Sequence, residues 1–144
     1  MKTISHLVMA VTFFSAAACS SSPTASKTQP EMEAGTKTGM VKNIVITDTV
    51  TPNALITHAG DEVRWINQRQ DSVIVSVDGP IDNRVSCRNG FSKAMGMGVD
   101  NSTTLSSNET AGLCFTRIGT VNYSVRPSSE KSSMARSQGS ITVQ

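Results

Sequence analysis

Length, composition and charge set the outer limits of what this chain can be. Its 144 residues allow one domain plus accessory segments. Thirteen basic and 11 acidic residues give a formal net charge of +2, which excludes the strongly basic surface of a nucleic-acid-binding protein. Three cysteines and two histidines leave few ways to build a transition-metal site.

The start of the chain has the features of an export signal. Lys2 supplies a positive charge, an apolar stretch runs from Ile4 to Ala18, and three alanines stand directly before Cys19. A charged start, a short apolar stretch and small residues at the cleavage site are typical of a secretory signal. The apolar stretch is shorter than the roughly 20 residues that a membrane-spanning helix needs. We therefore predict that residues 1–18 are a signal peptide.

Cys19 lies in a context that resembles the lipobox of bacterial lipoproteins, with small residues before it and Ser20-Ser21-Ser22 after it. The alanine at position 16 departs from the leucine expected there. The resemblance implies a thioether-linked diacylglycerol and a palmitate-type acyl group on Cys19, so that membrane lipid is a partner. Ser20 favours the outer membrane, facing the periplasm, in a Gram-negative cell. The alternative is an ordinary thiol at Cys19.

The segment after Cys19 lacks the periodicity of a folded element. Residues 20–40 are rich in Ser, Thr, Lys, Glu and Gly and contain two prolines. Such a composition cannot bury enough apolar surface to offset the entropy of ordering. We expect residues 19–40 to be a lipidated, disordered tether, and residues 41–144 to form the domain.

From Val41 onward the chain alternates between apolar and polar residues over short runs. Such runs, separated by turn residues, indicate an all-β, antiparallel sandwich. The apolar residues of these runs are Ile44–Ile46, Leu55, Val63, Trp65, Val73, Val75, Val77, Leu113, Phe115, Val121, Tyr123, Val125, Ile141 and Val143. The turns fall at Thr51–Asn53, Ala59–Asp61 and Asp78–Pro80.

The stretch from Ile81 to Asn108 breaks this pattern, because Gly, Ser, Asn and Met dominate it. It is long for a loop inside a compact domain, so it must carry structure of its own or be functional. Cys87 lies in it, and Cys114 lies on the following strand. When Cys19 is set aside, these two cysteines remain, and an even number in an exported chain suggests one disulfide. The alternatives are two free thiols or a metal pair.

Three motifs resemble the plastocyanin-like cupredoxin family. Leu55–Asn67, LITHAGDEVRWIN, is similar to its strand–turn–strand unit, which ends in an aromatic-x-Asn segment. Gly119–Tyr123 is similar to the entry of its penultimate strand, and Gly139–Val143 to its closing strand. The resemblance covers roughly residues 41–144 and implies a Greek-key β-sandwich.

The copper ligands of that family are not retained. The resemblance places its first His at about Ser72 and its Cys at Val125. Its second His falls among Ser128, Ser129 and Glu130, so that only the axial ligand has a counterpart, Met134. A blue-copper site needs two imidazoles and a thiolate, whereas the exported chain keeps one histidine, His58. Its position in the alternation predicts a surface residue.

Two further groups of residues leave alternatives open. Met95, Met97 and Met134 offer thioethers suited to Cu(I), but such side chains also fill gaps in a core, which is the interpretation we favour. Arg126, Lys131 and Arg136 could form a basic rim for an anionic partner, or be solvated loop charges. No hydrolase elbow, phosphate loop or C-x-x-C pair occurs.

The sequence therefore predicts a lipoprotein that is not an enzyme and has no cofactor. It would act as a binding or assembly module of the cell envelope through an unknown protein partner. The alternatives are a periplasmic Cu(I) handler that uses the methionines, and an accessory subunit of an electron-transfer complex.

Overall fold

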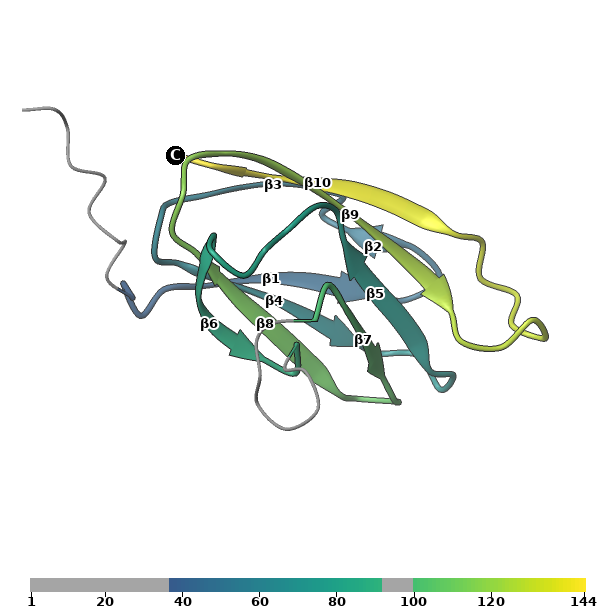
Figure 1. The fold of residues 1–144 in the computed structure, drawn as a ribbon. Helices are drawn as coiled ribbons and strands as arrows, with labels where there is room; N and C mark the ends of the chain where they lie inside the picture. Colours follow the sequence, from purple (N-terminus) through teal and green to yellow (C-terminus); the bar gives the residue numbers. More distant parts are fainter. Residues whose placement is uncertain (1–36, 92–99) are drawn as a thin grey trace, which may run out of the picture. The chain divides into compact units, whose positions relative to one another are not determined.

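The computed structural model describes residues 37–91 and 100–144, which form ten strands and no helix. In these ranges nothing meets the length and apolarity that a membrane-spanning helix requires. The strands form two five-stranded sheets (Figure 1). The predicted signal peptide, Cys19 and most of the predicted tether lie outside the described residues, as do Met95 and Met97.

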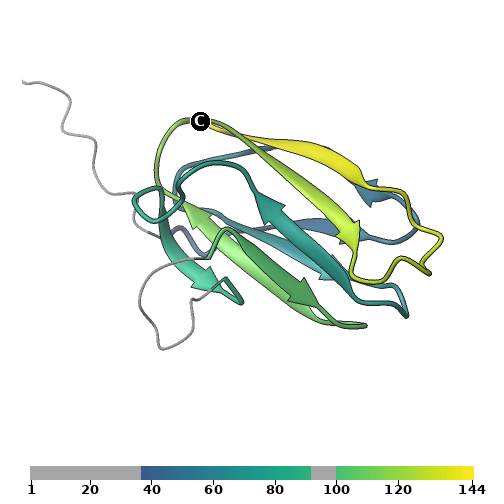
Figure 2. The ribbon, with the colours of Figure 1, turned by 45° about the vertical axis from the view of Figure 1, so that its right-hand side comes forward.

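The first sheet has the strand order β2-β1-β4-β8-β6. Its strands are β1 (Val41–Ile46), β2 (Val50–Thr51), β4 (Glu62–Asn67), β6 (Val85–Asn89) and β8 (Thr110–Phe115). The second sheet has the order β3-β10-β9-β5-β7. Its strands are β3 (Ala54–Thr57), β5 (Val73–Val77), β7 (Ser102–Leu105), β9 (Gly119–Pro127) and β10 (Ser137–Val143). Figure 2 shows the two layers from a second direction.

The all-β fold class is confirmed, but both sheets are mixed rather than purely antiparallel. β1 pairs parallel to β4, and β3 pairs parallel to β10. The expectation of antiparallel pairing was wrong at these two places because the chain changes sheets between β2 and β3. Strand alternation in a sequence reports which face is buried, and it does not report which strand lies alongside.

The core lies between the sheets and contains most of the apolar residues of the alternating runs, although Leu55 is only partly buried. It also contains residues from outside those runs, namely Val50, Ile81, Phe91, Leu105, Ala111 and Met134. Trp65 is fully buried, and its ring makes edge contacts with Phe91 at 5.5 Å and with Tyr123 at 5.6 Å between ring centroids. Trp65 belongs to the first sheet and Tyr123 to the second, so this pair joins the layers. Each fully buried large apolar side chain contributes about 1.5–3 kcal/mol relative to exposure.

The described parts of the stretch from Ile81 to Asn108, residues 81–91 and 100–108, carry structure of their own, as its length required. β6 pairs with β8 at the edge of the first sheet, and β7 pairs with β5 at the edge of the second. Ile81, Phe91 and Leu105 anchor the stretch, because all three are buried in the core. Their positions show that residues 81–91 and 100–108 are part of the sandwich.

Contacts with the domain begin slightly before Val41. The Thr38 amide donates to the Gly60 carbonyl at 3.1 Å, and the Thr38 hydroxyl donates to the Asp61 carboxylate. The Thr38 hydrogen bond is the main reason that the pKa of Asp61 lies below its ordinary value of 3.8. The last residues of the predicted tether therefore pack against the turn between β3 and β4. The tether and domain boundaries otherwise stay predictions.

Candidate functional site

The disulfide between Cys87 and Cys114 is present and joins β6 to β8. The two residues face each other in the strand register, with Cα atoms 4.9 Å apart. Their sequence separation of 27 residues makes the bond a long-range one. It fastens the predicted insertion to a strand of the first sheet, as the cysteine count suggested.

Glu62 lies next to this disulfide, and the three residues place possible ligand atoms within 4.8 Å of one another. The two sulfur atoms are bonded to each other and so provide no thiolate. The Glu62 carboxylate accepts from Arg64 at 2.9 Å from Nε and 2.8 Å from Nη2. In the oxidised protein the donor groups of this cluster are therefore already engaged.

The structure brings together two of the positions that the cupredoxin resemblance assigned to copper ligands. The Ser128 amide and hydroxyl donate to the Ser72 carbonyl at 3.0 and 2.9 Å. Val125 is fully buried on the core face of β9, and Met134 is 5% exposed within the apolar core. The position of Met134 agrees with the core-packing interpretation of that residue.

His58 lies far from these positions. It precedes β4, whereas Ser72 follows it, so roughly 20 Å of strand separates them. Its side chain is 75% exposed, as predicted, and its Nδ1 lies 3.7 Å from the Asp61 carboxylate. A type 1 copper centre needs two imidazoles and a thiolate. The residues described at this end of the sandwich offer hydroxyls, carboxylates and a thioether, but no imidazole and no thiolate, and so do not fit that metal.

Arg69 connects three loops at the same end of the sandwich. Its side chain is 8% exposed and donates to the Thr47 carbonyl at 3.2 Å and to the Asp48 carboxylate. Its other terminal nitrogen donates to the Ser132 hydroxyl at 3.3 Å and lies 3.6 Å from the Asp71 carboxylate. The loops that it joins are β1–β2, β4–β5 and β9–β10. We call this region the clamped loop end.

Asn67 completes the clamped loop end from within. It is fully buried, and its amide nitrogen donates to the carbonyls of Asp71, Leu105 and Ser106 at 2.9–3.0 Å. Its side-chain oxygen accepts from the Arg69 amide at 3.0 Å. This network gives a physical reason for an asparagine at the end of the aromatic-x-Asn segment. Polar groups in the region are thus largely used by the protein itself.

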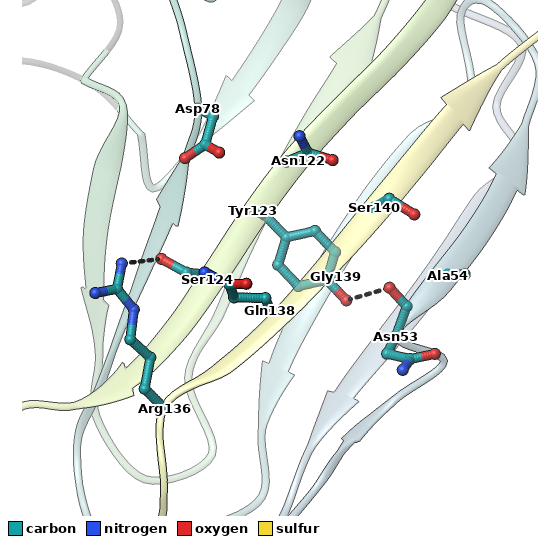
Figure 3. Close-up of a pocket in the computed structure, with 10 residues that line it drawn as sticks. All are labelled: Asn53, Ala54, Asp78, Asn122, Tyr123, Ser124, Arg136, Gln138, Gly139 and Ser140. Carbon is teal, nitrogen blue, oxygen red and sulfur yellow. Dashed lines mark hydrogen bonds between the residues drawn. The ribbon is translucent and has the colours of Figure 1, made fainter.

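A different polar region lies on the outer face of the second sheet. It is an open groove of about 620 Å³ along β9 and β10, which we call the β9–β10 groove. Small residues, Ala54, Ser124, Gly139 and Ser140, are among those that line it. Figure 3 shows longer polar side chains around them, namely Asp78, Asn122, Arg136 and Gln138.

Tyr123 and Gly139 form a cross-strand pair at the groove. A Cβ atom at position 139 would overlap with the Tyr123 ring and the Asn53 carbonyl, so this close approach requires glycine. The Tyr123 hydroxyl donates to the Pro52 carbonyl at 3.2 Å. The residue is 1% exposed, and burial raises the pKa of its hydroxyl to about 12.

The polar side chains around the groove have few partners inside the protein. Arg136 donates one hydrogen bond to the Ser124 hydroxyl at 3.4 Å. Asp78, Asn122 and Gln138 are exposed, and in the described part of the chain their side chains make no hydrogen bond or ion pair. The groove therefore offers both charges and both kinds of hydrogen-bonding group to a ligand.

The sequence grouped Arg136 with Arg126 and Lys131, either as solvated loop charges or as a basic rim for an anionic partner. The structure instead places Arg136 with Asp78, which the sequence marked only as a turn residue. Of the three basic residues, only Arg136 lines the groove. The available signal was the polar alternation of Asn122, Ser124, Gln138 and Ser140 on two adjacent strands.

Comparisons with known proteins give a fold likeness at low identity. No family model matches the chain. The search of curated proteins also gives no match. Solved structures of the cupredoxin amicyanin are similar to it. A reduced Cu(I) form is 19% identical over 74% of this chain and 83% of that one, with a TM-score of 0.45. An oxidised methionine-to-leucine mutant is 19% identical over 73% and 81%, with a TM-score of 0.46.

Proposed function

We propose that this chain is a non-enzymatic, lipid-anchored binding module of the bacterial cell envelope, and that the β9–β10 groove is its binding surface. The observation that carries the proposal is the groove itself. Its polar side chains gather around one hollow of about 620 Å³ and are largely unused by the protein. Ligand sites are concave, and a small number of convergent polar groups fixes the orientation of the ligand.

The chemistry of the described residues supports binding rather than catalysis. Acid–base or nucleophilic catalysis with Ser124 or Ser140 needs a general base within hydrogen-bond reach. The Asp78 carboxylate lines the groove but makes no hydrogen bond to either serine in the described residues. The only imidazole in the described residues, His58, belongs to the turn before β4 and does not line the groove. The proposal likewise excludes blue-copper electron transfer, because the residues near Ser72 and Ser128 do not supply the ligand set.

The anchoring part of the proposal rests on the sequence around Cys19. Cleavage after Ala18 and lipidation of Cys19 would hold the domain at a membrane, with Ser20 directing it to the outer membrane facing the periplasm. A Cys19→Ser variant should leave the membrane fraction and lose the mass of the lipid. A variant that fractionates with membranes like the parent would contradict the anchor.

Binding at the groove can be tested on the mature chain labelled for nuclear magnetic resonance. Soluble envelope extract should shift the backbone amides of Asn122, Ser124 and Gln138 in a saturable way. Amides at Arg69 and Asp71, in the clamped loop end, serve as the internal control. Uniform shifts, or none, would overturn the assignment of the groove.

Copper is tested separately on the same protein. Titration with Cu(II) should give no intense visible band, because a copper–thiolate bond has no thiolate to use at this end of the sandwich. Appearance of such a band would contradict the proposal.

A further inference from the structure

We infer that the β9–β10 groove binds a small zwitterionic peptide, with its ammonium group at Asp78 and its carboxylate at Arg136. This inference rests on the proposed binding function and names its ligand class. It follows from the charges that face the groove, their spacing and the side chains between them (Figure 3).

Asp78 provides the site for the cationic end. It follows the last residue of β5, and its backbone amide donates to the Asn122 carbonyl at 2.9 Å, which fixes its position beside β9. Its carboxylate has no partner among the described residues. An ammonium group brings three hydrogen-bond donors and no acceptor, and is the natural complement of such a carboxylate.

Arg136 provides the site for the anionic end. A guanidinium carries five N–H donors, and one of its terminal nitrogens here donates to Ser124 at 3.4 Å. That contact holds the side chain over the groove and leaves most of the donors open. Arginine binds carboxylates through two parallel hydrogen bonds, which gives directional recognition. The two charges do not form an ion pair with each other, since the described residues show no such contact.

The positions on β9 beside which the two charged residues lie are separated by about the length of a dipeptide. Asp78 lies level with Asn122, and Arg136 reaches Ser124, two residues further along β9. Two residues of a strand span about 6.6–6.8 Å. A dipeptide in extended form spans a similar length, because each residue adds at most about 3.3–3.6 Å.

The uncharged side chains of the groove fit the middle of such a ligand. Asn122 and Gln138 can both donate to and accept from a peptide group. A sugar is a poorer match, because no exposed aromatic ring lines the groove to pack against its apolar face. The one aromatic side chain that lines the groove, Tyr123, is 1% exposed.

The test uses alanyl-alanine and two blocked forms, with affinity measured from the shifts of the groove amides in the mature chain. Acetylation of the amino group removes the ammonium, and amidation removes the carboxylate. Each should weaken binding by about fivefold, the equivalent of about 1 kcal/mol for a partly exposed ion pair.

Variants assign each charge to its residue. In Asp78→Asn, the acetylated and free peptides should bind equally, while amidation still weakens binding. In Arg136→Gln, the amidated and free peptides should bind equally, while acetylation still weakens it. Glu130→Gln and Lys131→Gln are the matched controls, because both residues are exposed and neither lines the groove.

The outcomes separate the ligand class from the binding function. The inference is supported if Asp78→Asn binds the acetylated and free peptides equally and Arg136→Gln binds the amidated and free peptides equally. Groove shifts with envelope extract, but none with alanyl-alanine, would overturn the peptide class and keep the binding function. Absence of groove shifts with both would overturn the two together.

Discussion

The clamped loop end and the β9–β10 groove are both rich in polar side chains, but they use them differently. At the clamped loop end, Asn67 and Arg69 donate to partners in four loops and are almost completely buried. In the groove, Asp78, Asn122 and Gln138 are exposed, and their side chains have no partner among the described residues.

This difference predicts that the clamped loop end contributes to stability, whereas the β9–β10 groove is available for recognition. A buried hydrogen-bonding group that loses its partner costs about 1–3 kcal/mol, whereas an exposed one exchanges its partner for water at little cost. The clamped loop end should therefore respond to substitution as a structural element. Substitutions in the groove should leave the free energy of unfolding almost unchanged and should alter the affinity for the ligand.

The largest expected effect comes from replacing one asparagine in each region with alanine. Asn67→Ala should lower the free energy of unfolding by about 3–5 kcal/mol, because several buried groups lose their partner. Asn122→Ala should change it by less than about 0.5 kcal/mol. Chemical denaturation of both variants measures the two values. Similar losses in the two variants would remove the distinction between the regions.

A smaller effect is expected from the disulfide, which stabilises the first sheet without either polar network. Reduction should lower the free energy of unfolding by about 2–4 kcal/mol, since the bond closes a long loop in the unfolded chain. Thermal unfolding with and without a reductant measures it. A Cys87→Ala/Cys114→Ala variant is the control and should no longer respond. An unchanged melting temperature in the parent would contradict the prediction.

Alkaline pH tests the buried residue at the groove. The neutral Tyr123 hydroxyl is favoured in the folded state, because burial raises its pKa from 10.0 to about 12. The contribution of this hydroxyl to the free energy of unfolding is complete below pH 10. It is lost as pH rises from 10 through about 12, by about 1.4 kcal/mol per pH unit. Tyr123 is the single tyrosine of the chain, so Tyr123→Phe should flatten this part of the stability profile. Parallel profiles for parent and variant would show that another group is responsible.

The smallest effect concerns the two arginines. Arg69→Met should cost about 1 kcal/mol, because its carboxylate partner Asp48 is 92% exposed and well screened by water. Arg136→Met should cost less than about 0.5 kcal/mol. Denaturation at low and high salt compares them, and only the Arg69 effect should shrink with salt. A larger loss for Arg136→Met would place that residue among the structural groups.

Most of the core could be predicted from the sequence, because alternation reports burial directly. Val73, Val75 and Val77 alternate with polar or half-buried neighbours and are all buried. β6 and β7 could not be predicted, because Val85–Asn89 and Ser102–Leu105 are polar runs without a clear alternation. They become strands by pairing with β8 and β5 at the sheet edges.

The candidate site was predicted only in part. The missing copper ligands could be counted in the sequence, and the Cys87–Cys114 pair followed from an even number of cysteines. The groove could not be found that way, because Asp78 and Arg136 are 58 positions apart and belong to a turn and a loop. Cys19 and the anchor that it implies stay predictions.

The sequence by itself determined most of the burial pattern and the shortage of imidazole and thiolate ligands, because both depend on residue identity and short spacing alone. Only the tertiary structure decided which strands pair in parallel, that Arg69 joins three loops, and that Asp78 and Arg136 share one groove. These features depend on contacts between residues far apart in the chain, and local patterns in a sequence carry no record of such contacts.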